Sequence, residues 1–261
     1  AAEIRRLGSD TKDVRHVFLS HIHFDHAGAA WRFAELGATI YVHPRGAKHL
    51  IAPQKLIDSA TRIFRDKMEM LWGVIAPVPQ DRVHVLHDNE VVRIGRLEVK
   101  AIETPGHATH HHVYHWGDHL FGGDVGGVRL GNGPVIPPFV PPELQIEAWL
   151  ESIDKMRKVN ARALYLPHFG KVAVDLASHF DALERRVRSW AEWFRDRLRE
   201  GEDEAQIIPQ FSAYEFAEIR RDGASEEQWP DYEAADPSFM AVAAAARYWR
   251  KYHPDEIAPP V

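Results

Sequence analysis

The sequence predicts an α/β protein built in layers, and two observations carry that prediction. Short apolar runs rich in β-branched residues alternate with longer segments whose apolar residues recur at helical spacing. Several predicted strands also run directly into loops that carry histidine or aspartate. A rigid α/β scaffold usually presents its chemistry on loops at strand ends, so the same pattern predicts where a functional site lies.

The first part of the chain predicts strands that alternate with helices. Residues 14–19 form a short buried strand, and residues 29–36 form a helix that begins after Gly28 and ends at Gly37. Residues 39–42 are strand-like, and residues 45–72 have apolar residues at roughly helical spacing. These elements predict a sheet with helices packed on it.

The middle of the chain is rich in β-strand signals. Five segments separated by turn residues predict a meander: 82–86, 90–94, 97–103, 111–116 and 119–121. The stretch IGRL, residues 94–97, predicts a hairpin turn between two of them. Residues 126–142 are so rich in glycine and proline that we expect an irregular loop.

The last part of the chain is mostly helical in pattern. Residues 143–159 predict an amphipathic helix, residues 163–166 a buried strand, and residues 174–200 a long charged helix. We therefore expect a main α/β domain over residues 1–200 and a helical extension over residues 201–261. The alanine-rich end of the extension, with Tyr248 and Trp249, predicts a packing helix, and a homodimer interface is the alternative.

Composition narrows the chemistry that this chain can perform. The 261 residues are 45% hydrophobic, which is enough for a well-buried core, and the net charge of −6 gives no reason to expect nucleic acid as a partner. The absence of cysteine excludes disulfides, thiolate metal ligands and a cysteine nucleophile. Any metal ion must therefore bind nitrogen and oxygen donors, and the chain has 17 histidines to offer.

No segment suggests a membrane or an export signal. No apolar run approaches the about 18 residues needed to span a bilayer, and no signal-peptide pattern opens the chain. We therefore expect a cytoplasmic protein with no membrane partner. The chain starts with Ala1 rather than methionine, so this expectation applies to the sequence as given.

The stretch SHIHFDHAGAAW, residues 20–31, places three histidines and an aspartate within six positions after a buried strand. Side chains two residues apart in an extended segment point the same way, so His21 and His23 can bind one metal ion together. After a bend at the strand end, Asp25 and His26 can face a second ion. The alternative is a polar, exposed turn with a chance cluster of histidines.

Three more candidate ligands follow predicted strands. His107 lies in a Pro-Gly turn (TPGH), Asp124 follows two glycines, and His168 follows a strand and a proline. Each alone could be a turn or cap residue, but together they supply donors for two metal ions. His110, His111 and His112 have no such position, and we expect sheet packing or surface rather than a role beside the ligands or substrate. The other histidines are expected to be structural: His16, His43, His49, His84, His87, His115, His119, His179 and His253.

The set H-x-H-x-D-H, TPGH, GGD and PH resembles the metallo-β-lactamase superfamily of metallohydrolases, over residues 14–170 and in the family's order. The resemblance implies a four-layer αβ/βα sandwich. It also implies that His21, His23 and His107 bind one ion, that Asp25, His26 and His168 bind the other, and that Asp124 is shared. Members normally have a longer run of strands before the first motif, whereas only 20 residues precede His21. Either the first sheet is abbreviated or its first strands are missing from this sequence.

Two divalent ions roughly 3.5–4 Å apart would hold a bridging hydroxide ready at neutral pH, with Asp25 orienting it and taking its proton. We expect zinc as the ion, while iron, manganese and nickel accept the same donors. Because HFDHAG resembles quorum-signal lactonases and TPGHA resembles thioesterases of the glyoxalase II type, the expected substrate is a small ester, lactone or thioester. The alternatives are a phosphodiesterase, a ribonuclease or a β-lactamase of the same superfamily, or a non-catalytic metal-binding scaffold.

Two apolar groups of residues suggest a wall for a substrate pocket, with core filling as the alternative: Met68, Met70, Leu71 and Trp72 in the helical stretch, and Ile136 and Phe139 in the proline-rich loop.

Overall fold

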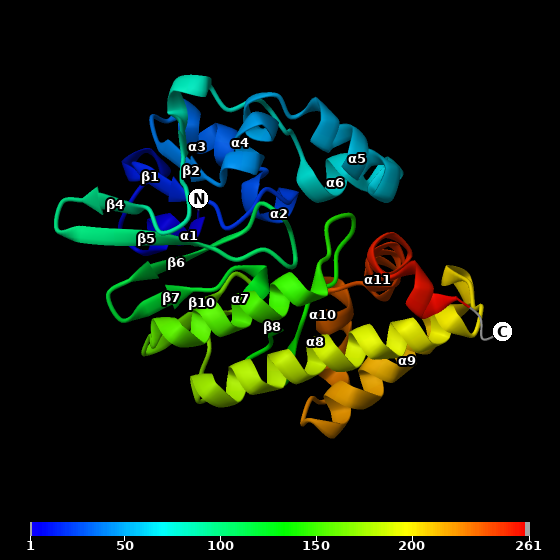
Figure 1. Cartoon of the computed structure of the whole chain (residues 1–261). Coiled ribbons are helices and arrows are strands. Elements are labelled where there is room, and N and C mark those ends of the chain that lie inside the picture. The colour runs from blue at the N-terminus through cyan, green and yellow to red at the C-terminus, as the bar shows by residue number, and fades with distance from the viewer. Residues whose placement is uncertain (1, 259–261) are drawn as a thin grey trace. The chain divides into compact units, whose positions relative to one another are not determined.

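The computed structural model describes residues 2–258, and their contacts divide the chain into two compact units. Unit 1 comprises Ala1–Val92, Ala101–Glu103 and His110–His112, and unit 2 comprises Arg93–Lys100, Thr104–Thr109 and Val113–Val261. The mixture of sheets and helices in Figure 1 confirms the predicted α/β class.

Unit 1 contains a parallel sheet of three short strands, in the order β1 (His16–Phe18), β2 (Thr39–Val42) and β3 (Val83–Val85). In register, His16 lies opposite Thr39, and Ile40 lies opposite Val83. The predicted strands 14–19 and 39–42 are thus confirmed. The carboxyl end of β1 delivers the chain directly to His21, which places the histidine cluster at the strand end as the sequence predicts.

Six helices of unit 1 connect or precede these strands: α1 (Ala2–Arg6), α2 (Phe24–Ala27), α3 (Ala30–Glu35), α4 (Pro44–Ile51), α5 (Gln54–Phe64) and α6 (Met68–Trp72). The helical stretch predicted over residues 45–72 is broken into three helices. Pro53 immediately precedes α5, and Arg65 after it has φ 49, a left-handed conformation that cannot continue an α-helix.

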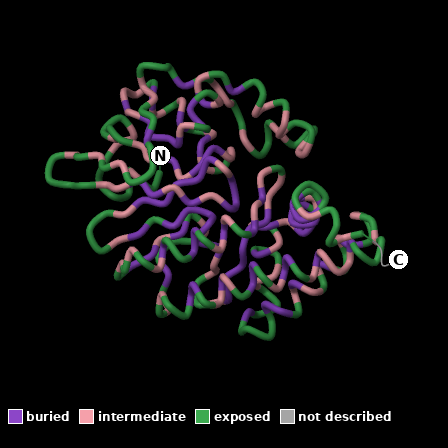
Figure 2. Tube along the Cα trace, viewed as in Figure 1, coloured by how far each residue is buried: buried purple, intermediate pink, exposed green. Residues whose placement is uncertain are grey.

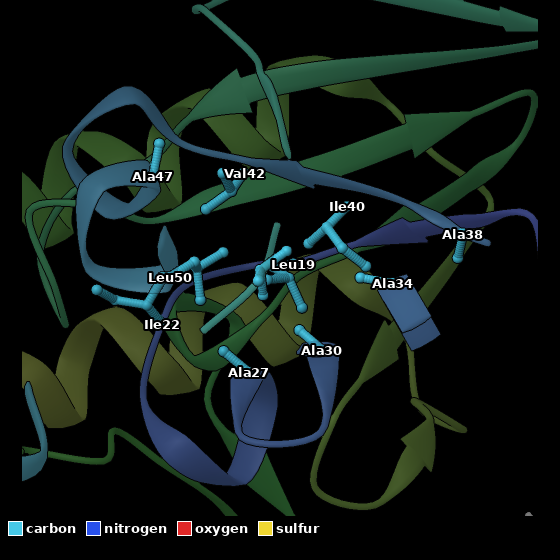
Figure 3. Close-up of a cluster of buried hydrophobic side chains, with 11 residues drawn as sticks. Leu19, Ile22, Ala27, Ala30, Ala34, Ala38, Ile40, Val42, Ala47 and Leu50 are labelled. Atoms are coloured by element: carbon cyan, nitrogen blue, oxygen red, sulfur yellow. The ribbon is translucent and has the colours of Figure 1, made fainter. Parts of the chain in front are cut away.

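The core of unit 1 lies between the sheet and its helices (Figure 3). Small residues on α3 approach β2 closely, so that Ala34 and Ala30 pack near Leu19 and Ile40. Ile22, between the two histidines of the motif, is buried in the same cluster. Burying a side chain of this size contributes about 1.5–3 kcal/mol, which fixes the face on which its neighbours His21 and His23 project.

A second sheet has six strands, in the order β11 (Gly170–Lys171), β10 (Ala163–Leu166), β7 (His119–Phe121), β6 (His112–Trp116), β5 (Leu97–Glu103) and β4 (Val91–Ile94). The four strands β4 to β7 are successive neighbours, so the predicted meander and the turn at Gly95 are confirmed for them. The prediction is wrong for residues 82–86, because β3 pairs in parallel with β2 in the other sheet. Strand alternation in such a short segment does not specify which sheet it joins.

Two further differences concern short strands. The loop predicted as irregular over residues 126–142 contains a two-stranded ribbon of β8 (Val128–Arg129) and β9 (Val135–Ile136). β11, which pairs antiparallel with β10, was not predicted at all. Each of these strands has only two residues, too few for an alternating pattern to appear.

Five helices complete unit 2: α7 (Ile146–Val159), α8 (Leu176–Arg199), α9 (Glu204–Arg221), α10 (Trp229–Ala235) and α11 (Ser238–Tyr252). Asp175 caps α8 by accepting a hydrogen bond from Ser178 N–H, and Asp203 begins α9 in a capping box with Gln206. α7 packs along α8, and α11 packs on both α8 and α9 (Figure 1).

The buried residues of α11 lie on one side of that helix (Figure 2), and they include Tyr248 and Trp249. Trp249 donates its indole N–H to the carbonyl of Ala191 on α8. The predicted packing helix is therefore confirmed within unit 2. Within residues 2–258, no helix combines the length and apolar character needed to cross a membrane.

Candidate metal centre

Unit 1 carries four of the seven predicted ligands, and they lie close to one another. His21 is fully buried after β1, and its Nε2 lies 2.9 Å from Nδ1 of His23. The hydroxyl of Ser20 lies 3.1 Å from Nδ1 of His21 and holds the other side of that ring. Two imidazole nitrogens therefore face each other across the extended segment, as the i and i+2 spacing predicts.

Asp25 and His26 follow in the first turn of α2, which begins after the extended backbone of His23. Nε2 of His26 lies 2.9 Å from Oδ2 of Asp25, and the ring of His26 lies 4.1 Å from that of His21 between centroids. The predicted bend is thus the start of a short helix. Asp25 keeps 37% of its side chain exposed, so water can reach this carboxylate.

The histidines after Thr109 pack behind this cluster. The ring of His110 stacks on His21 at 6.2 Å and meets His23 edge-on at 5.8 Å, while His111 lies 5.3 Å from His21. All three residues from His110 to His112 are buried, which excludes the surface position. Of the three, His112 lies in β6, whereas His110 and His111 precede the strand and pack beside the candidate ligands, a position that we did not expect. His110 and His111 thus form a wall against the ring of His21, and His110 also contacts that of His23.

His112 and His43 form a second pair of buried rings in unit 1, 4.7 Å apart between centroids. Burial lowers the pKa of His112 to about 3, and burial also lowers the pKa of His43. His43 donates from Nε2 to Glu103 and accepts at Nδ1 from the Arg45 N–H, so its tautomer is fixed. Both rings are therefore neutral near pH 7 and support unit 1 without adding positive charge beside the candidate ligands.

Unit 2 carries the remaining three predicted ligands. His107 is buried in the turn after β5, where its ring meets Trp149 of α7 edge-on at 5.9 Å. Gln145 donates its N–H to the carbonyl of Gly106, and Ser152 donates its hydroxyl to the carbonyl of Pro105. The first turns of α7 thus hold the TPGH turn from one side.

His107 has a defined tautomer. Nδ1 lies 2.8 Å from the carbonyl oxygen of Pro138, which can only accept, so Nδ1 carries the hydrogen. Nε2 is then the unprotonated nitrogen, and it lies 3.5 Å from Oδ2 of Asp124. A ring nitrogen fixed in this way by a main-chain carbonyl is a common feature of metal-binding histidines.

Asp124 stands between two histidines of unit 2. Its Oδ2 lies 3.5 Å from His107 Nε2, and its Oδ1 lies 3.7 Å from His168 Nε2. Gly123, at φ 52, makes the turn that brings Asp124 into the first position of a short 3-10 helix, Asp124–Gly126. One carboxylate oxygen therefore faces each imidazole.

These separations fit metal ligands better than hydrogen bonds. An N–H···O hydrogen bond is usually 2.7–3.2 Å long, whereas two ligands on a tetrahedral zinc ion lie about 3.4 Å apart. The 3.5 and 3.7 Å distances from Asp124 to His107 and His168 match the second case. His21 and His23 are closer at 2.9 Å, so their nitrogens would separate by about 0.5 Å to share one ion.

Several residues that hold the ligands in place were not predicted. The indole N–H of Trp149 donates to the carbonyl of Val125, next to Asp124, and the main-chain N–H of Arg129 donates to the carbonyl of His168. His179 lies 2.9 Å from the carbonyl of Gly126, and burial lowers its pKa to about 4. Nothing in the sequence pattern distinguishes these residues from ordinary core and loop positions.

The apolar residues considered for a pocket wall have different positions. Ile136 and Phe139 are fully buried, and Phe139 packs on Trp149 and Trp190, so both fill the core. Met70 is 74% exposed and Leu71 44% exposed on α6. Trp72 contacts Phe24 and Phe64, and thereby joins α6 to the helix that carries Asp25.

Comparison with known proteins identifies the family. The sequence matches the model of the Metallo-beta-lactamase superfamily over residues 1–168. It is 30% identical over 162 residues to the metallo-beta-lactamase fold-containing protein ST1585 of Sulfurisphaera tokodaii, covering 60% of this chain and 61% of that protein. It is also 30% identical over 113 residues to the N-acyl homoserine lactonase AttM of Agrobacterium fabrum, covering 43% of this chain and 39% of that protein. The chain therefore spans less than two thirds of the length of these relatives.

The fold agrees with the sequence match. The metallo-beta-lactamase family protein TTHA1429 from Thermus thermophilus is similar in structure, with a TM-score of 0.66 and 20% identity. The similarity covers 96% of this chain and 79% of that one, so it includes the C-terminal helices. The chain belongs to the metallo-beta-lactamase superfamily, a superfamily of metal-dependent hydrolases whose fold implies the binding of divalent metal ions.

Proposed function

We propose that this protein is a dinuclear metal-dependent hydrolase that cleaves a small ester, lactone or thioester. The first ion would be held by His21, His23 and His107, the second by Asp25, His26 and His168, and Asp124 would bridge both. The observation that carries the proposal is the position of Asp124, which turns one oxygen toward His107 and the other toward His168. A carboxylate held between two imidazoles in this way suits a bridging ligand.

The donor set supports divalent ions of zinc type. Five imidazoles and two carboxylates, with no thiolate in the chain, suit zinc first and iron, manganese or nickel as well. Two such ions, when bound, would supply Lewis acidity and a hydroxide at neutral pH. No serine or cysteine nucleophile is then required.

The residues of the chain would position the reactants. Asp25 is the only carboxylate of the H-x-H-x-D-H motif and is partly open to solvent, so it can hold the attacking water and accept its proton. His26, 2.9 Å from Asp25, would keep that carboxylate oriented. The carbonyl of Pro138 would keep His107 in the tautomer that presents Nε2.

The substrate class is supported by two arguments. AttM, a relative over 113 residues, is an N-acyl homoserine lactonase, which favours a lactone among the carbonyl substrates. The net charge of −6 does not favour a nucleic acid, so phosphodiester cleavage is the weaker alternative.

The test combines metal analysis with a panel of substrates. The protein is stripped with a chelator, reconstituted with zinc, manganese, iron(II) or nickel, and assayed on aryl esters, lactones, a thioester, bis-p-nitrophenyl phosphate and nitrocefin. We expect two ions per chain and metal-dependent turnover, with the highest kcat/KM on a carbonyl substrate. Turnover restricted to the phosphodiester or to nitrocefin would overturn the substrate class, and no metal-dependent turnover on any substrate would overturn the proposed activity.

Matched variants locate the site. His168→Ala should lower the metal content below two per chain, whereas His84→Ala, which removes a half-exposed histidine of β3, should leave it unchanged. Two ions per chain in His168→Ala would show that the second site is assigned to the wrong residues.

A further inference from the structure

Three helices of unit 2, α7, α8 and α10, hold the segment of chain that fixes His107. This segment, residues 125–139, runs from the residue after Asp124 to the residue after Pro138. Its main-chain carbonyls accept hydrogen bonds from buried side chains of three helices. The donors and acceptors are Trp149 to Val125, His179 to Gly126, Tyr232 to Pro134 and Arg186 to Val135.

A further hydrogen bond of this segment lies next to Pro138, whose carbonyl is the partner of His107. Pro138 accepts from His107 Nδ1–H, and the N–H of the following residue, Phe139, donates to Oδ2 of Asp236 over 3.3 Å. The Pro138–Phe139 peptide is therefore held at its carbonyl by His107 and at its N–H by Asp236. Any rotation of this peptide would move the oxygen that fixes the His107 ring.

A buried carboxyl group such as that of Asp236 is an unusual acceptor for a peptide N–H. It follows α10, 97 positions after Phe139, and it is fully buried. Within residues 2–258, its Oδ1 has no hydrogen-bond partner. A buried carboxylate costs several kcal/mol unless something compensates it, so it is retained here against a free-energy penalty.

Glu215 on α9 is a second buried carboxyl group whose charge interacts with that of Asp236. Glu215 is also fully buried, and neither of its oxygens has a hydrogen-bond partner in the described part of the chain. Burial raises the pKa of both carboxyl groups, and the Phe139 N–H pulls that of Asp236 back down. The Phe139 N–H can only donate, so Oδ2 of Asp236 is the acceptor of this hydrogen bond.

We propose that Asp236 is a positioning residue for the metal centre, which fixes the orientation and tautomer of His107 through the Pro138–Phe139 peptide. The proposal rests on the proposed function, since His107 matters in this way only as a metal ligand. It gives the end of helix α10 a part in metal affinity, although none of the seven proposed ligands lies there.

The alternative is that Asp236 is only structural. Its own N–H donates to the carbonyl of Tyr232, so it also ends α10, and its loss would lower stability in either case. Measurements of metal affinity and of the tautomer of His107 distinguish the positioning role from the purely structural role. Tyr232→Phe is the matched control, because it removes a hydrogen bond to the same segment at Pro134, four residues before Pro138.

The experiment compares Asp236→Ala, Asp236→Asn and Tyr232→Phe with the wild-type chain. Zinc and cobalt(II) affinities are measured by competition with a chelating dye, and the cobalt(II) protein is examined by visible spectroscopy. Loss of a group that orients a metal-binding histidine typically weakens metal binding about 10–100-fold. We expect that loss and a changed cobalt spectrum in Asp236→Ala, near-normal values in Asp236→Asn, whose amide oxygen can still accept, and normal values in Tyr232→Phe.

A second measurement needs no metal. Long-range ¹H–¹⁵N spectra of the metal-free protein report the tautomer of His107, which should be Nδ1–H in the wild type and mixed in Asp236→Ala. If Asp236→Ala does not fold, Asp236→Leu removes the acceptor without leaving a cavity. Unchanged affinity and an unchanged tautomer in a folded variant without the acceptor would overturn the positioning role. A wild type that binds no metal would instead overturn the proposed function, while the tautomer still decides the positioning role.

Discussion

Trp149 occupies the space that a side chain on Gly106 would need. A Cβ built on Gly106 would lie 2.5 Å from the Cα and the Cβ of Trp149, and Gly106 has φ 148, which L-residues rarely adopt. The contact is between two backbones, so neither side can yield easily. It places helix α7 directly against the turn that presents His107.

Gly106→Ala should therefore damage both the fold and the site. Overpacking a core typically costs about 1–3 kcal/mol, and the backbone conformation adds strain of similar size. We expect a lower free energy of unfolding by urea and fewer than two metal ions per chain. Gly95→Ala is the control for strain alone, because Gly95 also has positive φ but nothing lies within 4 Å of its added Cβ. Metal content in Gly106→Ala equal to that in Gly95→Ala would contradict this role of the contact.

Trp149→Phe tests the other side of the same contact. The smaller ring removes the donor to the carbonyl of Val125 and leaves a cavity beside His107 and Phe139. We expect a loss of about 2–4 kcal/mol in the free energy of unfolding. Trp193→Phe, on the half-buried side of α8, should cost less. Equal losses in the two variants would show that the Val125 hydrogen bond adds little.

Asp124→Asn changes the proposed bridging group with little change in shape. An amide has one oxygen and one NH₂ group, so it can face one imidazole as a ligand but not both. We expect one metal ion or fewer per chain, and kcat/KM on the best carbonyl substrate lower by roughly 100-fold or more, equal to about 2.7 kcal/mol of transition-state stabilisation. Atomic absorption and steady-state kinetics measure the two quantities. Two tightly held ions in this variant would remove Asp124 from the bridging position.

The pH dependence of stability should report the buried carboxyl of Glu215. Its pKa is raised by burial above the usual 4.5, so between 4.5 and the higher folded value the unfolded chain releases a proton that the folded chain keeps. Glu215 therefore makes the free energy of unfolding fall as pH rises through this range, by at most about 1.4 kcal/mol per pH unit, and Asp236, whose pKa burial also raises, adds a change of the same sign. Below pH 4.5 both states are protonated and the effect vanishes.

Glu215→Gln removes this titration, so its stability relative to the wild type should increase with pH above 4.5. Urea titrations between about pH 4 and 8 measure the difference. Glu192→Gln, on the exposed face of α8, is the control and should follow the wild type at every pH. Parallel curves for the wild type and Glu215→Gln would show that Glu215 is ionised in the folded protein.

Sequence patterns predicted the local elements well, because these depend on short stretches of chain, whereas the ligand assignment stays a prediction. The strand before His21 and the long helix over α8 have clear periodicity, and the H-x-H-x-D-H motif is contained within six residues. The sheet to which β3 belongs could not be predicted, since three strand residues pair equally well in either sheet.

The residues that hold the candidate ligands in place could not be predicted for a related reason. Asp236 meets Phe139 across 97 residues, and the acceptor for His107 is the main-chain carbonyl of Pro138, which has no signature in the sequence. Sheet packing or surface was expected for His110 to His112, but all three are buried, and His110 and His111 pack on the ring of His21, a contact that no local pattern shows. Such contacts depend on tertiary structure alone.

The central proposal is that seven residues hold two metal ions, and anomalous X-ray diffraction at the zinc edge tests it most directly. Crystals of the zinc-reconstituted protein should show two peaks roughly 3.5–4 Å apart. One should be bound by His21, His23 and His107, the other by Asp25, His26 and His168, with Asp124 between them. A single peak, or two peaks that do not share Asp124, would contradict the account.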